Sequence, residues 1–323
     1  MIRSFYLTSD GDVRTDLSPE DIKAALESDG VLWVDFFRPT REESALLSEV
    51  FHFHPLAIDD CLRPAFRPKV DAFEDYIFLI MHGPDSTGRG HELRSQELDA
   101  FLGPRFLVTF HHVPIRSIVN TLQQCEKAPA RTLGRGTDFV LYTILDQMAE
   151  NYSPSLSRTE AEVTRIEEQV LEARSRGEIL PELMRLRREL LNLRRVIAAQ
   201  RDAVNLLTHQ APPIISDRAR VYFRDVVDLY RRVLDVVEIQ RDALAGARDT
   251  YLALISNRMN EIMKTLTIMA TIMLPSTVVS GIYGMNFQLL PIREWRGGFL
   301  FAIGLMVCIS GSMLYFFRRK KWL

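Results

Sequence analysis

Residues 249–286 read DTYLALISNRMNEIMKTLTIMATIMLPSTVVSGIYGMN, and this stretch decides the architecture of the chain. Alternating steps of four and three residues from Asp249 trace one face of a helix. Between Lys264 and Arg293 no residue is charged, which is enough chain to cross a bilayer that needs roughly 20 apolar residues. The traced face is small, polar or flexible, and we name it the polar stripe: Ala253, Ser256, Asn260, Met263, Thr267, Ala270, Leu274, Thr277 and Gly281.

The polar stripe has two interpretations. Small residues on a membrane helix are more often signs of helix–helix packing. A polar seam that runs into Asn286, close after Gly284, instead indicates several copies of the helix around a water-filled path. Spacing alone leaves both interpretations open.

Composition favours a soluble domain joined to a modest membrane part. The chain has 323 residues, of which 47% are hydrophobic and 25% charged. A net charge of −2 gives no basic footprint for nucleic acid, and the start MIRSFYLTSDGD predicts no signal peptide. The three cysteines are far apart without metal-site spacing, which fits a reducing cytosol.

Residues 1–150 predict a mixed α/β domain. Ser18 before Pro19 predicts a helix N-cap, and Thr40 followed by Glu43 has the spacing of a capping box. His52, His54 and the adjacent His111 and His112 lack a third ligand at metal-site spacing, so we expect ordinary structural roles. Short β-rich runs between turn-forming residues predict strands at 4–7, 31–37, 76–82, 98–102 and 106–111.

Helical patterns follow. Residues 151–215 predict an antiparallel hairpin whose two apolar seams are broken at Arg176-Gly177. After Pro212-Pro213, Ser216 can cap a helix that runs without proline until Pro275; if continuous to Tyr283, it is on the order of 100 Å long. The seam residues are Leu156, Thr159, Val163, Ile166 and Val170, then Leu183, Leu186, Leu190, Leu193 and Ile197.

The C-terminal part predicts two membrane spans. The stalk at 216–261 leads into a pore helix at 262–283, and a loop at 284–298 leads into a second span at 299–317. The tail at 318–323 begins Arg-Arg-Lys-Lys, and the positive-inside rule assigns this end to the cytoplasm. Two spans then put the N-terminal part in the cytoplasm too, with only the loop outside.

Several motifs along the chain resemble those of one known family. Tyr-Gly-Met-Asn-Phe at 283–287 closes the first membrane helix and looks like the signature of the CorA family of magnesium/cobalt (divalent cation) transport proteins. Asn-Glu-Ile-Met-Lys at 260–264 and the terminal Lys-Lys-Trp-Leu at 320–323 are similar to the family as well. So are His-Pro-Leu-Ala-Ile-Asp-Asp at 54–60 and Arg-Pro-Lys-Val at 67–70.

The resemblance implies a homopentameric funnel in the inner or plasma membrane, with Gly284, Met285 and Asn286 as the selectivity filter. A ring of Asn286 carbonyls would accept hydrogen bonds from the water shell that Mg²⁺ sheds reluctantly. The implied pore and gate positions are Asn260, Met263, Leu266, Leu274 and Thr277. Leu266 lies one place off the polar stripe.

The resemblance also implies regulation by Mg²⁺ bound between neighbouring cytosolic domains. Asp60 and Asp249 match one carboxylate pair, and Asp59, Asp146 and Asp225 resemble a second cluster. Without the resemblance, Asp59, Asp60 and Asp249 are better interpreted as solvated. When the ion leaves, repulsion between the carboxylates would let the stalk helices splay.

The loop departs from the family, and other functions remain open. Gln288 and Ile292 stand where family members commonly carry acids, and Arg293 is added, so the loop would attract cations less strongly. The first interpretation is a Mg²⁺ channel, with Co²⁺ and Ni²⁺ as further ions. The alternatives are a zinc transporter of the same superfamily and a membrane-anchored sensor or scaffold that conducts nothing. No catalytic motif and no phosphate-binding glycine loop is seen, so we expect neither an enzyme nor an organic cofactor.

Overall fold

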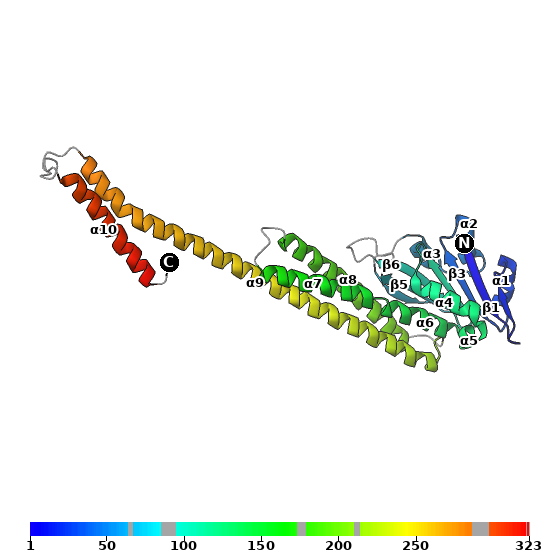
Figure 1. Ribbon diagram of the computed structural model, residues 1–323. Coiled ribbons are helices and arrows are strands. Elements are labelled where there is room, and N and C mark those ends of the chain that lie inside the picture. The colour runs from blue at the N-terminus through cyan, green and yellow to red at the C-terminus, as the bar shows by residue number, and fades with distance from the viewer. Residues whose placement is uncertain are drawn as a thin grey trace. The chain divides into compact units, whose positions relative to one another are not determined.

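The computed structural model describes residues 1–63, 67–84, 95–172, 179–209, 214–285, 297–320 and 322. The chain forms two compact units, Met1–Ala247 and Arg248–Leu323. Figure 1 shows the helices and strands of both.

The first unit is built on a seven-stranded sheet in the order β2-β1-β3-β7-β6-β5-β4. β3 and β7 pair in parallel, and the other neighbours pair antiparallel. All five predicted strands are confirmed, whereas β2 and β4 were missed because three or four residues are too short to show alternation. The strands are β1 (Ile2–Leu7), β2 (Val13–Thr15), β3 (Val31–Phe37), β4 (Lys69–Ala72), β5 (Ile77–Pro84), β6 (Ser95–Leu102) and β7 (Phe106–His111).

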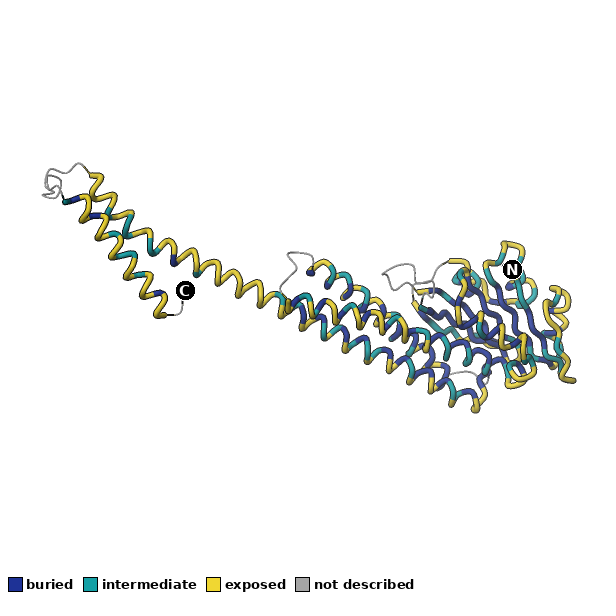
Figure 2. Tube along the Cα trace, viewed as in Figure 1, coloured by how far each residue is buried: buried dark blue, intermediate teal, exposed yellow. Residues whose placement is uncertain are grey.

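Helices cover both faces of this sheet. On one face lie α1 (Pro19–Leu26), α2 (Arg41–Glu49) and α3 (Pro55–Leu62), around a core that includes Phe53 stacked on Phe101 with ring centroids 3.9 Å apart. Strand residues of opposite parity, such as Trp33, are buried on the other face, where α5 (Pro129–Leu133) and α6 (Thr137–Glu150) contact the strands and α4 (Arg116–Lys127) packs on α5 and α6. Figure 2 shows the central strands mostly buried.

The two predicted helix starts are confirmed. The Ser18 hydroxyl accepts a hydrogen bond from the backbone N–H of Asp21 at 3.2 Å. At α2 the Thr40 hydroxyl accepts from the Glu43 N–H at 3.1 Å, and the Glu43 carboxylate accepts from the Thr40 N–H at 2.8 Å. Both side chains thereby satisfy donors that have no partner inside the helix.

A bundle of α7 (Ser153–Leu171), α8 (Ile179–His209) and the first part of α9 (Asp217–Gly284) completes the unit. The predicted hairpin is confirmed, and every residue of its two predicted seams is buried. Arg165 pairs with Glu182, and Arg185 pairs with Glu162 at 2.9 Å, which fixes the antiparallel register. Gln240 of α9 accepts a hydrogen bond from Thr159 at 2.6 Å and ties the third helix to the hairpin.

The second unit consists of the rest of α9 and α10 (Gly298–Arg319). The long helix predicted from Ser216 to Tyr283 is confirmed, with Pro275 inside it. α9 and α10 are long and apolar enough to cross a membrane. Figure 2 shows most of both helices exposed in this unit, the pattern expected of surfaces that meet lipid or other copies of the chain.

Candidate functional site

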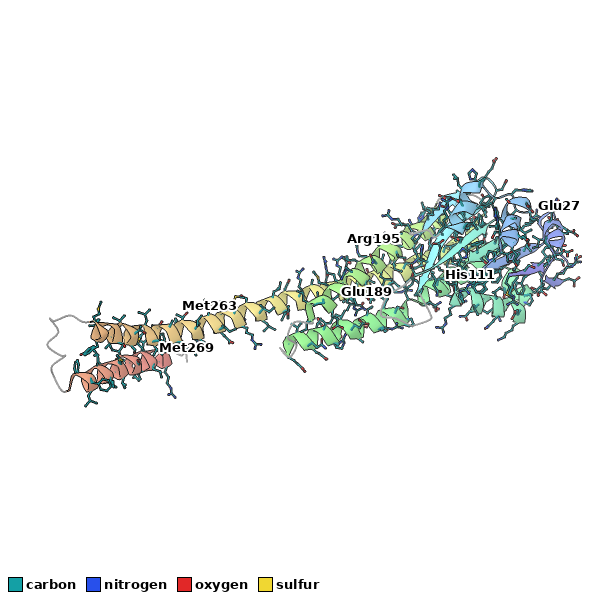
Figure 3. All side chains as sticks on the ribbon, turned by 90° about the horizontal axis from the view of Figure 1, so that it is seen from above. Glu27, His111, Glu189, Arg195, Met263 and Met269 are labelled. Carbon is teal, nitrogen blue, oxygen red and sulfur yellow. The ribbon has the colours of Figure 1, made fainter. Side chains whose placement is uncertain are left out.

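The polar stripe lies on the exposed side of α9 within the second unit. Met263, Leu274 and Thr277 are exposed, and so is Leu266, the position just off the stripe. Figure 3 shows side chains such as Met263 and Met269 projecting from this helix. Hence the implied gate positions are not packed against described residues of their own chain.

The opposite side of α9 faces α10. Ile268 is buried there, and the Ser276 and Ser310 hydroxyls lie 3.2 Å apart. At about 100° per residue, Met263, Leu266, Leu274 and Thr277 lie at least about a third of a turn away from Ile268. A groove of about 490 Å³ beside the serine contact is lined in part by Ser280 and also by Thr277. Small residues outside the polar stripe, such as Ser276, therefore make most of the close contact between α9 and α10. Most of the polar stripe stays uncovered.

Threonines of this helix satisfy their own hydroxyl donors. Thr267 donates to the Met263 carbonyl at 2.8 Å and Thr277 to the Met273 carbonyl at 3.0 Å. Such bonds to the preceding turn remove the cost of an unpaired donor in an apolar environment while leaving the oxygen free to accept. A threonine on this face can thus accept from a water molecule.

The predicted filter lies at the end of α9. Gly284 is the last helical residue, and a side chain added there would meet open space. The Met285 N–H donates to the Ile282 carbonyl at 3.3 Å, so the helix closes with a turn, and Met285 is 53% exposed. Asn286 and the departing loop residues Gln288, Ile292 and Arg293 lie outside the described residues.

Asp59 and Asp60 lie in the second half of α3. The His54 side chain caps the start of this helix. Asp59 pairs with Arg63 at 3.2 Å, one turn along the helix. The Lys69 ammonium, on β4, lies 2.6 Å from Asp60 and 2.7 Å from Asp71. Burial lowers the pKa of Lys69, but the hydrogen bonds to Asp60 and Asp71 outweigh it and raise the pKa overall. Sequence reasoning missed Lys69 as the counter-charge of Asp60, although the Arg-Pro-Lys-Val motif contains it.

Asp146 and Asp225 are brought near each other by α6 and α9. Burial, together with the nearby carboxylates of Glu150 and Asp225, raises the pKa of Asp146 to about 6. Asp225 itself is exposed. A group whose ionised form is disfavoured by neighbouring carboxylates would be stabilised by a cation, which is the electrostatic demand of a divalent site.

One copy of the chain does not assemble a metal site from described residues. Among them, no group of three or more histidine, cysteine, aspartate or glutamate side chains is placed to hold an ion. Asp249, in the second unit, pairs with Arg248 at 2.7 Å and is 65% exposed.

The histidines have structural roles, as predicted. The His54 ring accepts a hydrogen bond from the Leu56 N–H at 3.2 Å. His111 is buried, with one ring nitrogen 2.7 Å from the Val113 carbonyl and the other 3.3 Å from Asp35. Burial lowers the pKa of His111, but the Asp35 carboxylate outweighs this and raises the pKa overall.

The long helix α9 begins in the αβα unit and ends in an apolar segment beside the apolar helix α10. This combination is typical of a membrane protein with a large domain outside the membrane. Residues 28–319 match the family model described as CorA-like Mg²⁺ transporter protein. The chain therefore belongs to the CorA family of divalent-cation transporters, which are not enzymes.

Individual relatives agree with this assignment. The chain is 37% identical over 290 residues to the putative metal ion transporter YfjQ of Bacillus subtilis, covering 90% of this chain and 89% of the relative. It is 34% identical over 278 residues to the cobalt/magnesium transport protein CorA of Thermotoga maritima, covering 86% and 79%. The zinc transport protein ZntB of Yersinia pseudotuberculosis is more distant, at 23% over 261 residues, covering 80% and 78%.

A solved structure extends the likeness to the whole fold. The complete structure of the CorA magnesium transporter from Methanocaldococcus jannaschii matches with a TM-score of 0.84 and 27% identity. The match covers 100% of this chain and 99% of that one. The predicted fold class is confirmed over both units.

Proposed function

We propose that this protein is a channel for Mg²⁺, with Co²⁺ and Ni²⁺ as further ions, that lets them flow inward down their electrochemical gradient. The observation that carries the proposal is the polar stripe of α9, most of which lies on the side that α10 leaves uncovered. Helices that present such a face to one another enclose a path, whereas lipid would meet an apolar face. The name of the Thermotoga maritima relative supports the choice of ions.

The pore is a homopentamer with Asn286 at its outer mouth. The amide oxygens of five Asn286 side chains accept hydrogen bonds from the waters around Mg²⁺, so the ion enters without losing its shell. Gly284 gives the chain freedom to turn at this point, and Met285 lies between them. The loop at 284–298 faces outward, and both termini lie in the cytoplasm of a cell with this protein in its inner or plasma membrane.

The gate lies below the filter. Leu266 and Leu274 form apolar constrictions that block ions by excluding water. Thr277 and Met263 line the path between filter and entrance, and Asn260 holds a hydrated ion at the cytosolic end. No ATP is needed, because a divalent ion gains roughly 4–5 kcal/mol per 100 mV of inside-negative potential.

Cytosolic Mg²⁺ regulates the gate. An ion bridges Asp60 of one subunit and Asp249 of the next, with Lys69 as the cation it must displace from Asp60. A second ion is held by Asp59, Asp146 and Asp225, and the pKa of Asp146, raised to about 6, supports this choice. When Mg²⁺ is scarce the bridges empty, the carboxylates repel one another, and α9 carries the change to the pore.

Ion flux into liposomes that contain the purified protein tests the proposal. We expect uptake of Mg²⁺ and Co²⁺, and we expect Asn286→Ala to abolish Mg²⁺ flux or its control by internal Mg²⁺. The variant must elute at the same oligomeric size as the parent, so that loss of flux is not loss of assembly.

Two other outcomes would select the alternatives. Flux of Zn²⁺ without Mg²⁺ would identify a zinc transporter, which the non-acidic outer loop and the ZntB relatives favour. No flux of any ion from a verified oligomer, with Asn286→Ala unchanged, would identify a non-conducting sensor or scaffold.

A further inference from the structure

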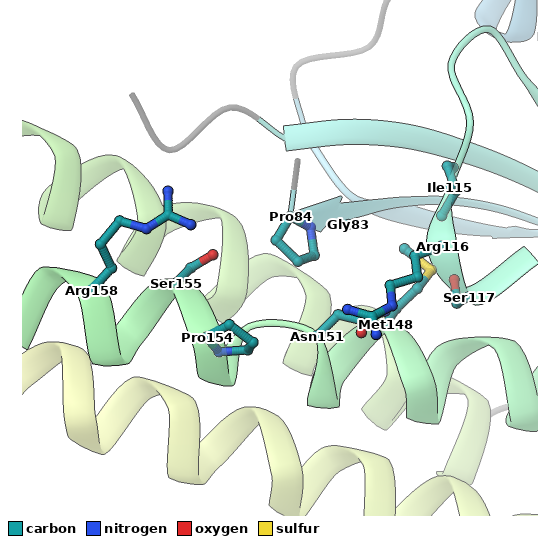
Figure 4. Close-up of a pocket in the computed structure, with 10 residues that line it drawn as sticks. All are labelled: Gly83, Pro84, Ile115, Arg116, Ser117, Met148, Asn151, Pro154, Ser155 and Arg158. Atoms are coloured by element: carbon teal, nitrogen blue, oxygen red, sulfur yellow. The ribbon is translucent and has the colours of Figure 1, made fainter. Parts of the chain in front are cut away.

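A cavity of about 100 Å³ lies wholly within the first unit, and none of the proposed regulatory carboxylates lines it (Figure 4). It is enclosed by the end of β5 at Gly83-Pro84, the start of α4, and the junction of α6 and α7. We propose that it binds a phosphate-type oxyanion, either the free ion or the phosphate group of a small ester. The inference does not depend on which ion the channel passes.

Two guanidinium groups give the cavity its charge. Arg116 projects from the first position of α4 and Arg158 from the second turn of α7, and both line the cavity (Figure 4). In the described part of the chain neither makes an ion pair or a side-chain hydrogen bond, and none of the described lining residues is acidic. Guanidinium groups without a carboxylate partner can donate charge-assisted hydrogen bonds to an oxyanion.

The start of α4 adds backbone donors. The first backbone hydrogen bond of this helix is from the Val119 N–H to the Ile115 carbonyl, and no side chain caps it. The N–H groups of Arg116, Ser117 and Ile118 thus find no partner among the described residues. The positive end of the helix dipole and three free donors favour an anion.

Ser117 is the independent indication of a ligand. Its residue is fully buried, yet its hydroxyl oxygen has no hydrogen-bond partner among the described residues. A buried hydroxyl without a partner costs stability and needs an explanation. Ser117 lines the cavity, so a bound oxyanion would supply the missing acceptor. Ser155 and Asn151, from the α6–α7 junction, line the same cavity and offer further polar groups.

The size of the cavity limits the ligand. At about 30 Å³ for each molecule of liquid water, 100 Å³ corresponds to roughly three waters. That volume is enough for a compact group such as phosphate. A phosphate ester would place its phosphate inside and its organic part outside.

Titration calorimetry of the full-length protein in detergent tests the inference, with inorganic phosphate as the first probe and AMP as the second. Chloride at matched ionic strength is the blank. We expect saturable phosphate binding, weakened at least about tenfold by Arg116→Gln and by Arg158→Gln. AMP binding more tightly than phosphate would identify an ester as the ligand, and the reverse would identify the free ion; both support the site.

Ser117→Ala separates binding from folding. Without phosphate we expect its melting temperature to equal or exceed that of the parent, because an unsatisfied buried hydroxyl is removed. With phosphate it should show less than the parent's rise in melting temperature. Arg195→Gln, on the exposed surface of α8 (Figure 3), removes the same charge elsewhere and should leave binding unchanged.

Three results would overturn the inference. The first is a phosphate response no larger than that of chloride. The second is an equal response in the parent and in a double variant of Arg116 and Arg158. The third is a double variant that no longer assembles, combined with a parent that does not respond to phosphate. That result would assign the two arginines to a contact between subunits.

Discussion

The two units of this chain differ in how completely a single copy buries its hydrophobic side chains and links its polar ones. In Met1–Ala247 the sheet is buried on both faces, and Trp33, Phe36 and Phe101 are fully buried. In Arg248–Leu323 the buried hydrophobic residues, among those described, are Ile268, Ala302 and Phe317. One copy therefore completes the core of the first unit, whereas the second unit leaves most of its hydrophobic surface uncovered, as expected of helices that contact lipid.

Polar groups show the same contrast. In the first unit the Trp33 indole donates to the Thr109 hydroxyl at 3.1 Å, and Thr109 donates to Asp35 at 2.5 Å, linking two strands far apart in sequence. In the second unit Thr265 and Thr271 donate to carbonyls four residues earlier in their own helix. Long-range bonds specify one fold, whereas local ones satisfy the donor within its own helix and fix no contact with another element.

The largest effect should come from the core of the first unit. Phe101→Ala removes a ring stacked on Phe53, and we expect it to lower the free energy of unfolding by about 3–5 kcal/mol. Met273→Ala, at a side chain that is 69% exposed in the second unit, should change it by less than about 0.5 kcal/mol. Denaturant unfolding in detergent, followed by near-UV circular dichroism, measures both. Similar losses for the two variants would contradict the contrast between the units.

The next effect concerns the two sides of α9 in the second unit. Leu274→Ser puts a hydroxyl at a proposed constriction, so we expect Mg²⁺ flux at high internal Mg²⁺ to rise by about tenfold or more as the gate becomes wet. The matched control is Ile272→Ser, two residues away, which borders the groove beside α10. It should leave the closed-state flux low. A leak from Ile272→Ser but not from Leu274→Ser would mean that the pore lies on the side of α9 that faces α10, and it would contradict the proposed pore face.

Local patterns predicted much of the fold, and the reason is visible in particular residues. Val163 and Leu190 belong to seams that repeat over several helical turns, so a period of three and four residues identified both helices and their buried faces. β4 gave no such signal because four residues hold too little of a period. The start of α4 was missed because its N-cap, Ile115, makes no side-chain cap.

The candidate sites depended on contacts that sequence spacing does not contain. Asp60 was predicted as a ligand, but its partner Lys69 is recognised only when β4 lies beside α3. The cavity that joins Arg116 to Arg158 brings together residues from two helices separated by two others. Asn286 came from a motif, and its role still depends on the flux experiment.

A third prediction concerns regulation, where the first unit is expected to act on the second. Asp60→Asn and Asp249→Asn each remove one proposed ligand of the bridging ion, so the Mg²⁺ concentration that closes the channel should rise about tenfold. Asp228→Asn is the control, because Asp228 is exposed on α9 and pairs with Arg231 at 2.8 Å. Flux into liposomes preloaded with increasing Mg²⁺ measures the shift. An unchanged closing concentration in both ligand variants would remove these carboxylates from the regulatory site.

The smallest expected effect is on the free energy of unfolding, and it tests whether the ionised Asp146 side chain is unfavourable until a cation binds. Its pKa of about 6 in the folded protein lies above the ordinary value of 3.8, so the folded state binds more protons than the unfolded state between those values. Ionised Asp146 therefore destabilises the fold, and the penalty is absent below about pH 4 and complete above about pH 6. Asp146→Asn should raise the free energy of unfolding by about 1 kcal/mol near pH 7.5 without Mg²⁺, after allowance for solvent screening.

The dependence on pH and on Mg²⁺ makes this last prediction specific. Near pH 4 the gain from Asp146→Asn should vanish, because the parent carboxyl is then protonated as well. Saturating Mg²⁺ should stabilise the parent more than the variant, because only the parent offers a carboxylate to the ion. Asp235→Asn, at an exposed residue of α9, should show neither dependence. An equal gain at both pH values would mean that the amide simply packs better at this position. The proposal that the charge of Asp146 serves to bind a regulatory cation would then lose its electrostatic support.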